Sequence, residues 1–481
     1  MFVIGALLTF PAVRQHDVDF ERRAVATPRR IVVPFGAEKI TMPPATTLRE
    51  AYQATDPRPL QSGDPYFVDL ASARGSAATV RLRQMIENCA PGNYSPISFS
   101  GHRGSGKSTE LRQLEQALGP SCFMLYLDVN EFLDAADVDY TDLFLLISRR
   151  LLESLQEANV SLSESLLHAV EGWFKEVTEE TEETVKLSAG VTTEAKAGVE
   201  IPFLARLLAK FTADAKVGSS SRITTRQKLD SYFSGLLSNT NLLLTAAAEA
   251  LRSAGKPCQL LIVFDNLDRL PPARSEKLFF DHGSELQDMA CHAVYTVSID
   301  TYYSPRGLPN VFPSRAILPN VKLWARKTKA DQNQAGIAAL VEVVRRRLDV
   351  DTLIHPPSLT EEFVRLSGGS VRQLIRLVRE AVLGAQSRGL AAIDADAAQD
   401  AAGNLQQDFE RMLEPSDYKL LARTWATKSI EKDDAHMQLL SNLAILEYNG
   451  KELWHDVNPL IEPIDAFRAV AKKSRPKRRR R

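Results

Sequence analysis

Eight consecutive residues, Gly101–Ser108 (GHRGSGKS), have the types and spacing that binding of a polyphosphate requires. Glycines let the backbone turn sharply, so that several N–H groups can be directed at one anion. Lys107 adds a positive charge, and the Ser108 hydroxyl is a hard oxygen ligand of the kind that Mg2+ prefers. This Walker A pattern predicts a site for ATP with Mg2+, to which we assign these residues: Gly101, His102, Arg103, Gly104, Ser105, Gly106, Lys107, Ser108 and Thr109.

A second motif, LLIVFDNLD at 260–268, is an apolar run that ends in acids. Ligands of parallel α/β sheets collect at the carboxyl ends of strands, so we assign Asp265 to the metal ion, together with Ser108, as in a Walker B motif. The alternative is an ordinary Asp at a strand-to-turn junction. The neighbouring Asn266 and Asp268 are candidate catalytic residues beside Lys107.

Strand-like and helical patterns alternate around these motifs, which predicts an α/β fold: a P-loop parallel sheet sandwiched by helices, then a helical lid and a C-terminal winged helix. The winged helix is predicted because two helices are followed by strand-like runs on either side of Asn449-Gly450. The predicted strands are Ile97–Ser100, Phe123–Val129, Gln259–Phe264, His292–Ile299 and Asn320–Trp324. The predicted domains are an extension at 1–45, an ATPase core at 46–329 with an insertion near 177–221, a lid at 330–408, a winged helix at 409–465 and a basic tail at 466–481.

These motifs resemble the AAA+ and STAND ATPases, and within them the prokaryotic ATPases similar to the origin-recognition-complex and Cdc6 type. The resemblance implies a sensor serine at Ser298 and a sensor arginine at Arg372, which follows the paired glycines Gly368 and Gly369. It also implies an arginine finger for a neighbouring subunit, at Arg315 or else Arg306. The plain alternatives are a turn serine, a surface helix arginine and solvated loop arginines.

The sequence departs from the family at one position. Many of these ATPases place a Glu after the metal-binding Asp, whereas this chain has Asn266. An amide orients water but cannot act as a general base, so we expect slow hydrolysis unless Asp268 substitutes. Slow hydrolysis is typical of a nucleotide-dependent switch that controls assembly or a partner. The alternatives are a DNA-binding ATPase of the replication-initiator or transposition-helper type and a scaffold that binds nucleotide without hydrolysing it.

Charge and composition constrain the partners. The chain is 44% hydrophobic and has a net charge of −1, but eight of its 59 basic side chains lie in the last ten residues, so the remainder carries −9. The basic tail suits nucleic acid, an acidic surface or plain solvation. The second helix of the winged-helix segment (HMQLLSNL) is not basic, so protein-facing and DNA-facing roles stay open. Homo-oligomers and a protein effector are further expected partners.

The sequence predicts no integral membrane segment, because no apolar run approaches 18 residues. The four cysteines lack metal-site spacing, and the apolar start of the chain lacks the features of a signal peptide. We therefore expect reduced thiols and a cytoplasmic location. In the insertion, the amphipathic stretch Ile201–Lys216 has three candidate partners, namely the protein's own core, a membrane surface and another subunit.

Overall fold

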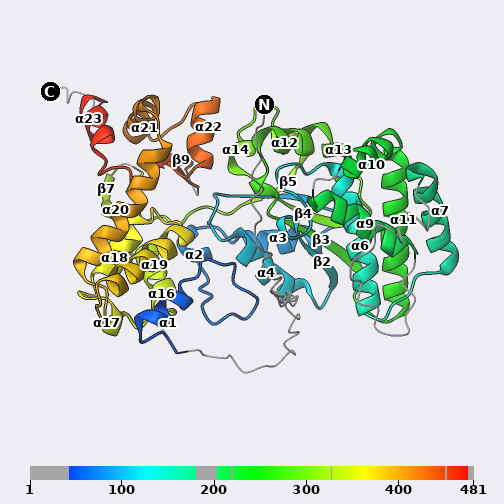
Figure 1. The fold of residues 1–481 in the computed structure, drawn as a ribbon, viewed down its shortest axis with the longest axis horizontal. Coiled ribbons are helices and arrows are strands. Elements are labelled where there is room, and N and C mark those ends of the chain that lie inside the picture. The colour runs from blue at the N-terminus through cyan, green and yellow to red at the C-terminus, as the bar shows by residue number, and fades with distance from the viewer. Residues whose placement is uncertain (1–42, 180–202, 218–219, 327, 450–451, 475–481) are drawn as a thin grey trace, which may run out of the picture. The chain divides into compact units, whose positions relative to one another are not determined.

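The computed structural model of the 481-residue chain describes residues 43–179, 203–217, 220–326, 328–449 and 452–474 (Figure 1). Most of the predicted extension at 1–45, the middle of the predicted insertion and the end of the basic tail lie outside these residues. Gly450 of the predicted Asn-Gly turn also lies outside them. The extension and the tail therefore stay predictions.

Five parallel strands form the central sheet, in the order β2-β3-β4-β1-β5. They span Pro96–Ser100 (β1), Cys122–Asp128 (β2), Gln259–Asp265 (β3), His292–Val297 (β4) and Ser314–Ile317 (β5). The first four lie where the sequence predicts strands. The prediction of a strand at Asn320–Trp324 is wrong, because the fifth strand comes earlier. Val321 and Leu323 are buried in the core of the helices that follow, and of the predicted strand only Trp324 pairs, as the first residue of a short strand outside the central sheet.

Helices cover both faces of the sheet, as alternation along β3 shows. Leu260, Ile262 and Phe264 join one apolar core, and Leu261 and Val263 join another. Burial on both faces is typical of a parallel sheet, and it confirms the predicted α/β fold class. The second core includes α3 (Ala78–Glu87) and α4 (Lys107–Leu118), and the first includes α6 (Tyr140–Glu157).

The described residues of the predicted insertion near 177–221 belong to the end of α7 (Glu164–Thr178), to α9 (Phe203–Val217) and to the start of α10 (Ser220–Ser231). These helices and α11 (Phe233–Ser253), which follows them, extend the first core. On α9, the apolar side chains Leu204, Leu207, Leu208 and Phe211 are buried in this core. The amphipathic stretch therefore packs on the protein itself, which is one of the three partners expected from the sequence.

Short helices lie before the sheet and between its strands. Their bounds are Leu48–Ala54 (α1), Ala71–Arg74 (α2), Val129–Phe132 (α5), Leu267–Arg269 (η1), Pro272–Glu276 (α12), Lys277–Asp281 (η2), Gly283–Gln287 (α13), Ile299–Tyr302 (α14) and Leu308–Val311 (α15). The helices α5, η1 and α14 directly follow β2, β3 and β4, so they start at the edge of the sheet where the phosphate loop also begins.

The chain after the sheet is mostly helical. Two short strands, Trp324–Ala325 (β6) and Thr328–Gln332 (β7), pair with each other before the lid helices. The lid helices are Gln334–Arg345 (α16), Val350–Leu353 (α17), Leu359–Leu366 (α18), Val371–Ser387 (α19) and Ala395–Met412 (α20). No helix in the described ranges has both the length and the apolar character that crossing a membrane would need.

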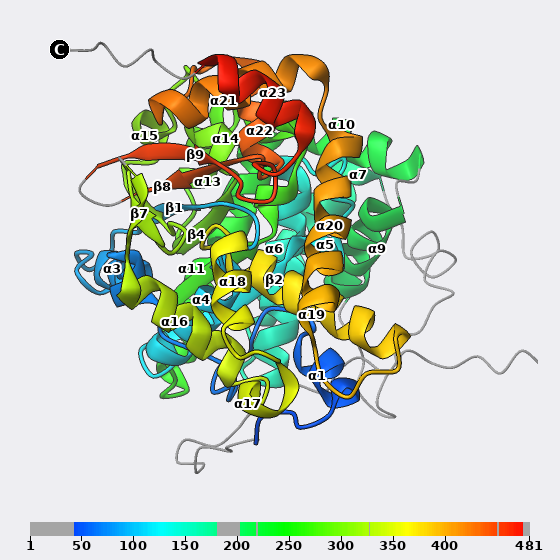
Figure 2. The same cartoon turned by 90° about the vertical axis from the view of Figure 1, so that its left-hand side faces the viewer.

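The C-terminal segment has two helices, an antiparallel hairpin and a last helix (Figure 2). These elements are Pro415–Thr427 (α21), Asp434–Ser441 (α22), Ile445–Tyr448 (β8), Trp454–Val457 (β9) and Asp465–Ser474 (α23). Two helices followed by a hairpin is the order that the sequence predicts for a winged helix. One continuous apolar core joins this segment to the lid helices and to α1.

The paired glycines before α19 are positions where backbones approach closely. Val321 N donates to Gly369 O at 3.1 Å, and a Cβ on Gly369 would lie only 1.9 Å from Val321 O. The φ of Gly369 is +86°, which also favours glycine. On the adjacent residue, Gly368 O accepts a hydrogen bond of 2.7 Å from the Tyr448 hydroxyl. The glycine pair therefore connects the start of the lid helix to the segment before the lid and to β8.

Candidate functional site

The loop from Gly101 to Ser108 connects β1 to α4. Gly104 and Gly106 have φ values of +81° and +106°, which side-chain-bearing residues rarely adopt. Because α4 begins at Lys107, the free N–H groups of its first turn lie at the end of this loop. The structure thus forms, from the predicted residues, a turn and helix start of the kind that binds phosphate. Thr109 accepts a hydrogen bond from Leu60 N at 3.1 Å, which holds the preceding chain against α4.

The ammonium of Lys107 lies within the loop. Its Nζ donates to Gly101 O at 2.7 Å and to His102 O at 3.0 Å, and it is 2.9 Å from Asp268 Oδ2. Lys107 is only 5% exposed, so the ion pair with Asp268 is buried. Burial alone would raise the pKa of Asp268, but the charge and hydrogen bond of Lys107 hold this pKa below its ordinary value. Lys107 therefore already holds a carboxylate at the phosphate loop.

Ser108 and Asp265, the predicted metal ligands, lie together. The Ser108 side chain is near enough to the Asp265 carboxylate to lower its pKa. Tyr126, on β2, donates to Asp265 Oδ2 at 2.5 Å, and Asn266 N donates to Oδ1 at 2.9 Å. Burial nevertheless raises the pKa of Asp265 above its ordinary value. A hydroxyl and a buried carboxylate side by side fit a hard divalent cation such as Mg2+, whose charge would favour the ionised carboxylate. Their role toward a metal stays a prediction.

Asn266 contacts a carboxylate that the sequence analysis missed. Its Nδ2 donates to Asp128 Oδ1 at 2.7 Å, and its backbone has a φ of +68°. Asp128 ends β2 directly opposite Asp265 in the parallel register. The sequence signal was available, because Asp128 follows an apolar strand just as Asp265 does. Asp268, which the sequence offered as a substitute base, is instead paired with Lys107.

Arg372 lies against the loop. Its backbone N donates to Gly104 O at 3.2 Å, and a Cβ on Gly104 would lie 2.5 Å from the Arg372 Cβ. Burial, and next the charge of Arg269, lowers the pKa of the Arg372 guanidinium, while the charge of Asp268 opposes this shift. Arg103, also in the phosphate loop, has its Nη2 3.4 Å from Arg269 O. The first turn of α19 is thus in contact with the phosphate loop.

The other residues implied by the resemblance have contacts of their own. The Ser298 hydroxyl, just after β4, is 2.7 Å from the Thr301 hydroxyl and is 8% exposed. Arg306 pairs with Asp281 at 2.6 Å and with Glu276 at 3.8 Å. Arg315, in β5, contacts Pro313 O at 3.4 Å. Their roles toward a nucleotide or a neighbouring subunit stay predictions.

His102 connects the loop to the C-terminal hairpin. Its Nε2 accepts a hydrogen bond of 2.7 Å from Glu447 N, and the side chain is 1% exposed. The Glu447 carboxylate accepts from the Tyr303 hydroxyl and lies 3.7 Å from His455 Nε2. Burial alone would raise the pKa of Glu447, but hydrogen bonds from His455 and Tyr303 hold it below its ordinary value. A phosphate-loop residue thus joins a buried polar cluster that includes both hairpin strands.

The burial of His102 predicts that stability falls in mild acid. Burial lowers the pKa of His102 from 6.5 to about 4, although the charge of Glu447 opposes this. The unfolded chain takes up the proton near pH 6.5, so stability is complete above that pH and is lost as the pH falls toward 4. Between pH 7 and pH 5 we expect His102 to account for about 2 kcal/mol of lost unfolding free energy.

Urea unfolding of wild type and His102→Gln at these two pH values measures this contribution, because the neutral amide cannot take up the proton. His168→Gln is the matched control, since His168 is an exposed histidine on α7. If His102→Gln loses as much stability between pH 7 and pH 5 as wild type does, His102 is not the group responsible.

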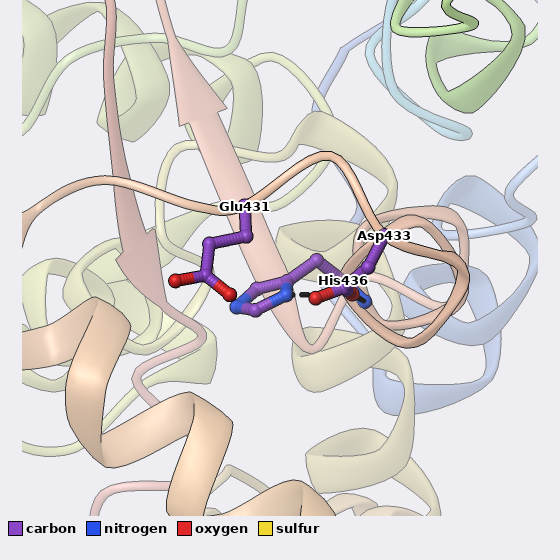
Figure 3. Close-up of side chains that lie close together, drawn as sticks. All are labelled: Glu431, Asp433 and His436. Carbon is purple, nitrogen blue, oxygen red and sulfur yellow. Dashed lines mark hydrogen bonds and ion pairs between the residues drawn. The ribbon is translucent and has the colours of Figure 1, made fainter.

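Glu431, Asp433 and His436, near α22, lie close enough together to hold a metal ion (Figure 3). No other such group of histidine, cysteine or acidic residues occurs in the described ranges. Asp433 Oδ1 accepts from His436 N at 2.8 Å and lies 2.8 Å from His436 Nδ1. Glu431 pairs with Arg423 at 2.7 Å. Since Asp433 caps the helix and Glu431 already has a cationic partner, we assign this cluster to stabilising the start of α22.

Comparison with known proteins supplies structural neighbours only. No family model matches the chain, and no curated protein matches it. Among solved structures, the chain is similar to Cdc6p from Pyrobaculum aerophilum, with 11% identity, a TM-score of 0.38, and coverage of 88% of this chain and 98% of that one. It is similar to the Aeropyrum pernix ORC2 protein, with 11% identity, a TM-score of 0.34, and coverage of 89% and 98%.

A Walker-type ATPase of Pyrococcus abyssi is also similar, with 14% identity, a TM-score of 0.38, and coverage of 86% of this chain and 99% of that one. Cdc6 and ORC proteins are the type that the sequence resemblance names. At these identities and TM-scores, the fold assignment depends on the strand order and loop geometry of this chain itself.

Proposed function

We propose that this chain is an ATP-binding ATPase of the AAA+ or STAND type that acts as a nucleotide-dependent switch, with slow hydrolysis controlling assembly or a partner. One observation carries the proposal. Within three residues, the phosphate loop is hydrogen-bonded to both C-terminal parts of the chain: His102 to β8 and Gly104 to α19. A ligand that rearranges this loop therefore acts directly on the lid and on the hairpin.

The ligand chemistry follows from the residues present. Lys107 can exchange the Asp268 carboxylate for phosphate oxygens, and the first turn of α4 offers its N–H groups. Ser108 and Asp265 would hold Mg2+, which supplies charge neutralisation of the phosphates when bound. Asp128, held by Asn266, provides a carboxylate close to Asp265 to orient a water molecule. The chain has Asn266 where many related ATPases have a Glu after the metal-binding Asp, and the nearby carboxylate of Asp128 is held by the Asn266 amide. This arrangement supports slow hydrolysis.

A DNA-directed role has less support from the C-terminal segment. The helix α22 begins with Asp434, has a second acid at its N-cap, and buries His436, Leu439 and Leu440. It also packs against α14 of the ATPase core, so part of its surface already contacts protein. Phosphate backbones require basic side chains, which α22 lacks. We therefore favour a protein partner or a second copy of the chain, in the cytoplasm, as the output of the switch.

Hydrogen exchange with and without ATP and Mg2+ tests the switch. We expect ATP to change the protection of two peptides, one covering β8 and β9 and one covering the first turns of α19, because both contact the loop. A peptide in α11, whose side chains pack in the core on the far side of β3, serves as the internal control. ATP binding without any change in the hairpin and α19 peptides would contradict the switch and favour the non-signalling scaffold.

A further inference from the structure

Arg74, the last residue of α2, is an arginine buried beside the phosphate loop. Its side chain is 3% exposed, and its Nη2 donates to Ser105 O at 2.6 Å. The nearest carboxylate oxygen, on Glu110, is 4.0 Å from Nη1, which is too far for a hydrogen bond. Within the described ranges, the Nε and Nη1 atoms of Arg74 are buried without a hydrogen-bond partner. The guanidinium thus has one close contact, and that contact is to the loop.

This arrangement is unfavourable if Arg74 only serves the folded core. A buried cation needs full pairing to offset its lost hydration, and Glu110 also accepts a hydrogen bond from Thr79. Burial accordingly lowers the pKa of the Arg74 guanidinium, opposed by the charges of Glu110 and Asp69. Incompletely paired ionisable groups in buried positions concentrate at functional sites. The location of the single strong contact indicates what that function is.

The contact fixes the orientation of one peptide unit. A trans peptide is planar, and its C=O and N–H point in opposite directions. With Ser105 O held by Arg74, the Gly106 N–H points to the opposite side of the loop. Among the described residues, no acceptor takes a hydrogen bond from this N–H. Gly106 has a φ of +106° and no side chain, so little else restricts rotation of this peptide.

We propose that Arg74 is a positioning residue of the phosphate loop, which holds the Ser105–Gly106 peptide so that the Gly106 N–H faces the polyphosphate. This inference rests on the proposed nucleotide site and adds to it a residue that lies 27 positions before Gly101 in the chain. The guanidinium acts from behind the loop, where Nη2 is 3.5 Å from the position of a Cβ on Gly106. Its charge also adds to the positive potential that the loop presents to an anion.

The test is ATP affinity, measured by displacement of a fluorescent ATP analogue in Mg2+, alongside thermal melting without nucleotide. Arg74→Met keeps the length and apolar stem of the side chain but removes the donor. We expect ATP to bind roughly tenfold to a hundredfold more weakly. This is the effect of losing one hydrogen bond to a charged group, here the bond from the Gly106 N–H to a phosphate oxygen. The melting temperature without nucleotide should change little, because an incompletely paired buried cation adds little stability. Arg74→Lys, which keeps a charged donor, should restore part of the affinity.

Arg83→Met is the matched control, since Arg83 is a 44% exposed arginine on α3 that pairs with Glu87 at 3.4 Å. A lower melting temperature with unchanged ATP affinity in Arg74→Met would show a purely structural role and overturn the inference. If Arg74→Met does not fold, Arg74→Gln takes its place, and failure of both to fold would also show a structural role. Failure of the wild type to bind ATP would instead overturn the proposed function itself.

Discussion

Lys107→Ala is expected to abolish most of the stabilisation that ATP and Mg2+ give to the wild type. Lys107 is the cation inside the loop, with its Nζ within 3.0 Å of two loop carbonyl oxygens and of Asp268. At a ligand concentration 100 times the dissociation constant, the wild type gains about 2.7 kcal/mol of unfolding free energy. The variant should gain little at the same concentration, as measured by thermal melting with and without ATP and Mg2+.

The same variant is also expected to be less stable without nucleotide. Removing Lys107 leaves Asp268 as an unpaired carboxylate in a site where it is 7% exposed, and breaking a buried ion pair in this way costs about 3–5 kcal/mol. For each protein, the effect of the nucleotide is therefore the difference in stability measured with and without ATP and Mg2+. Lys419→Ala, which removes an exposed lysine of α21, is the control. A Lys107→Ala protein that ATP stabilises as much as the wild type would show that the loop is not the nucleotide site.

Asp268→Asn is expected to bind ATP more tightly than the wild type, by roughly tenfold or more. The Asp268 carboxylate is paired with the Lys107 ammonium, which the phosphate oxygens would also contact. The nucleotide must therefore compete with this carboxylate for Lys107. Without nucleotide the variant should be less stable by roughly 3 kcal/mol, because Lys107 loses its partner while the amide still accepts a hydrogen bond. Fluorescent-nucleotide titration and urea unfolding measure the two effects.

Asp281→Asn is the matched control, since Asp281 is a 51% exposed carboxylate paired with Arg306. Its nucleotide affinity should equal that of the wild type. Weaker ATP binding by Asp268→Asn would mean that Asp268 assists binding of the nucleotide or its metal, and would contradict the competition. Unchanged affinity with lost phosphate release would instead favour the role as a substitute base that the sequence suggested.

Local sequence patterns predicted the strands, the loop and the helix start that carry the candidate site residues. The loop at Gly101–Ser108 and the strand ending at Asp265 are signals in which a few adjacent residues determine both conformation and chemistry. The parallel arrangement is also indicated by the sequence. Strands of a parallel sheet are buried on both faces, so they occur as continuous apolar runs without alternating polar residues. Ser108 and Asp265, 157 positions apart, meet because both stand at the same edge of the sheet.

Contacts between distant segments could not be read from the sequence in the same way. The sequence assigns His102 to the nucleotide site and does not indicate its hydrogen bond with the backbone of Glu447, in the C-terminal hairpin. The sequence predicts Asp268 as a substitute base because the pattern shows its place in the chain and not its contact with Lys107. The wrong fifth strand has the same origin, since the burial of Val321 comes from the later lid helices. Periodicity reports burial, and only the tertiary structure shows which partner provides it.

The apolar core shared by α1, the lid helices and the C-terminal segment has a mechanical consequence. Close-packed cores deform little, so the elements around this one are expected to rotate together as a lever instead of bending. The short arm of the lever is the first turn of α19, which touches Gly104, and the long arm extends through α20 to α23. A shift of the backbone at Gly104 would then be amplified with distance, and the largest displacement would occur at α23, where a partner could detect it.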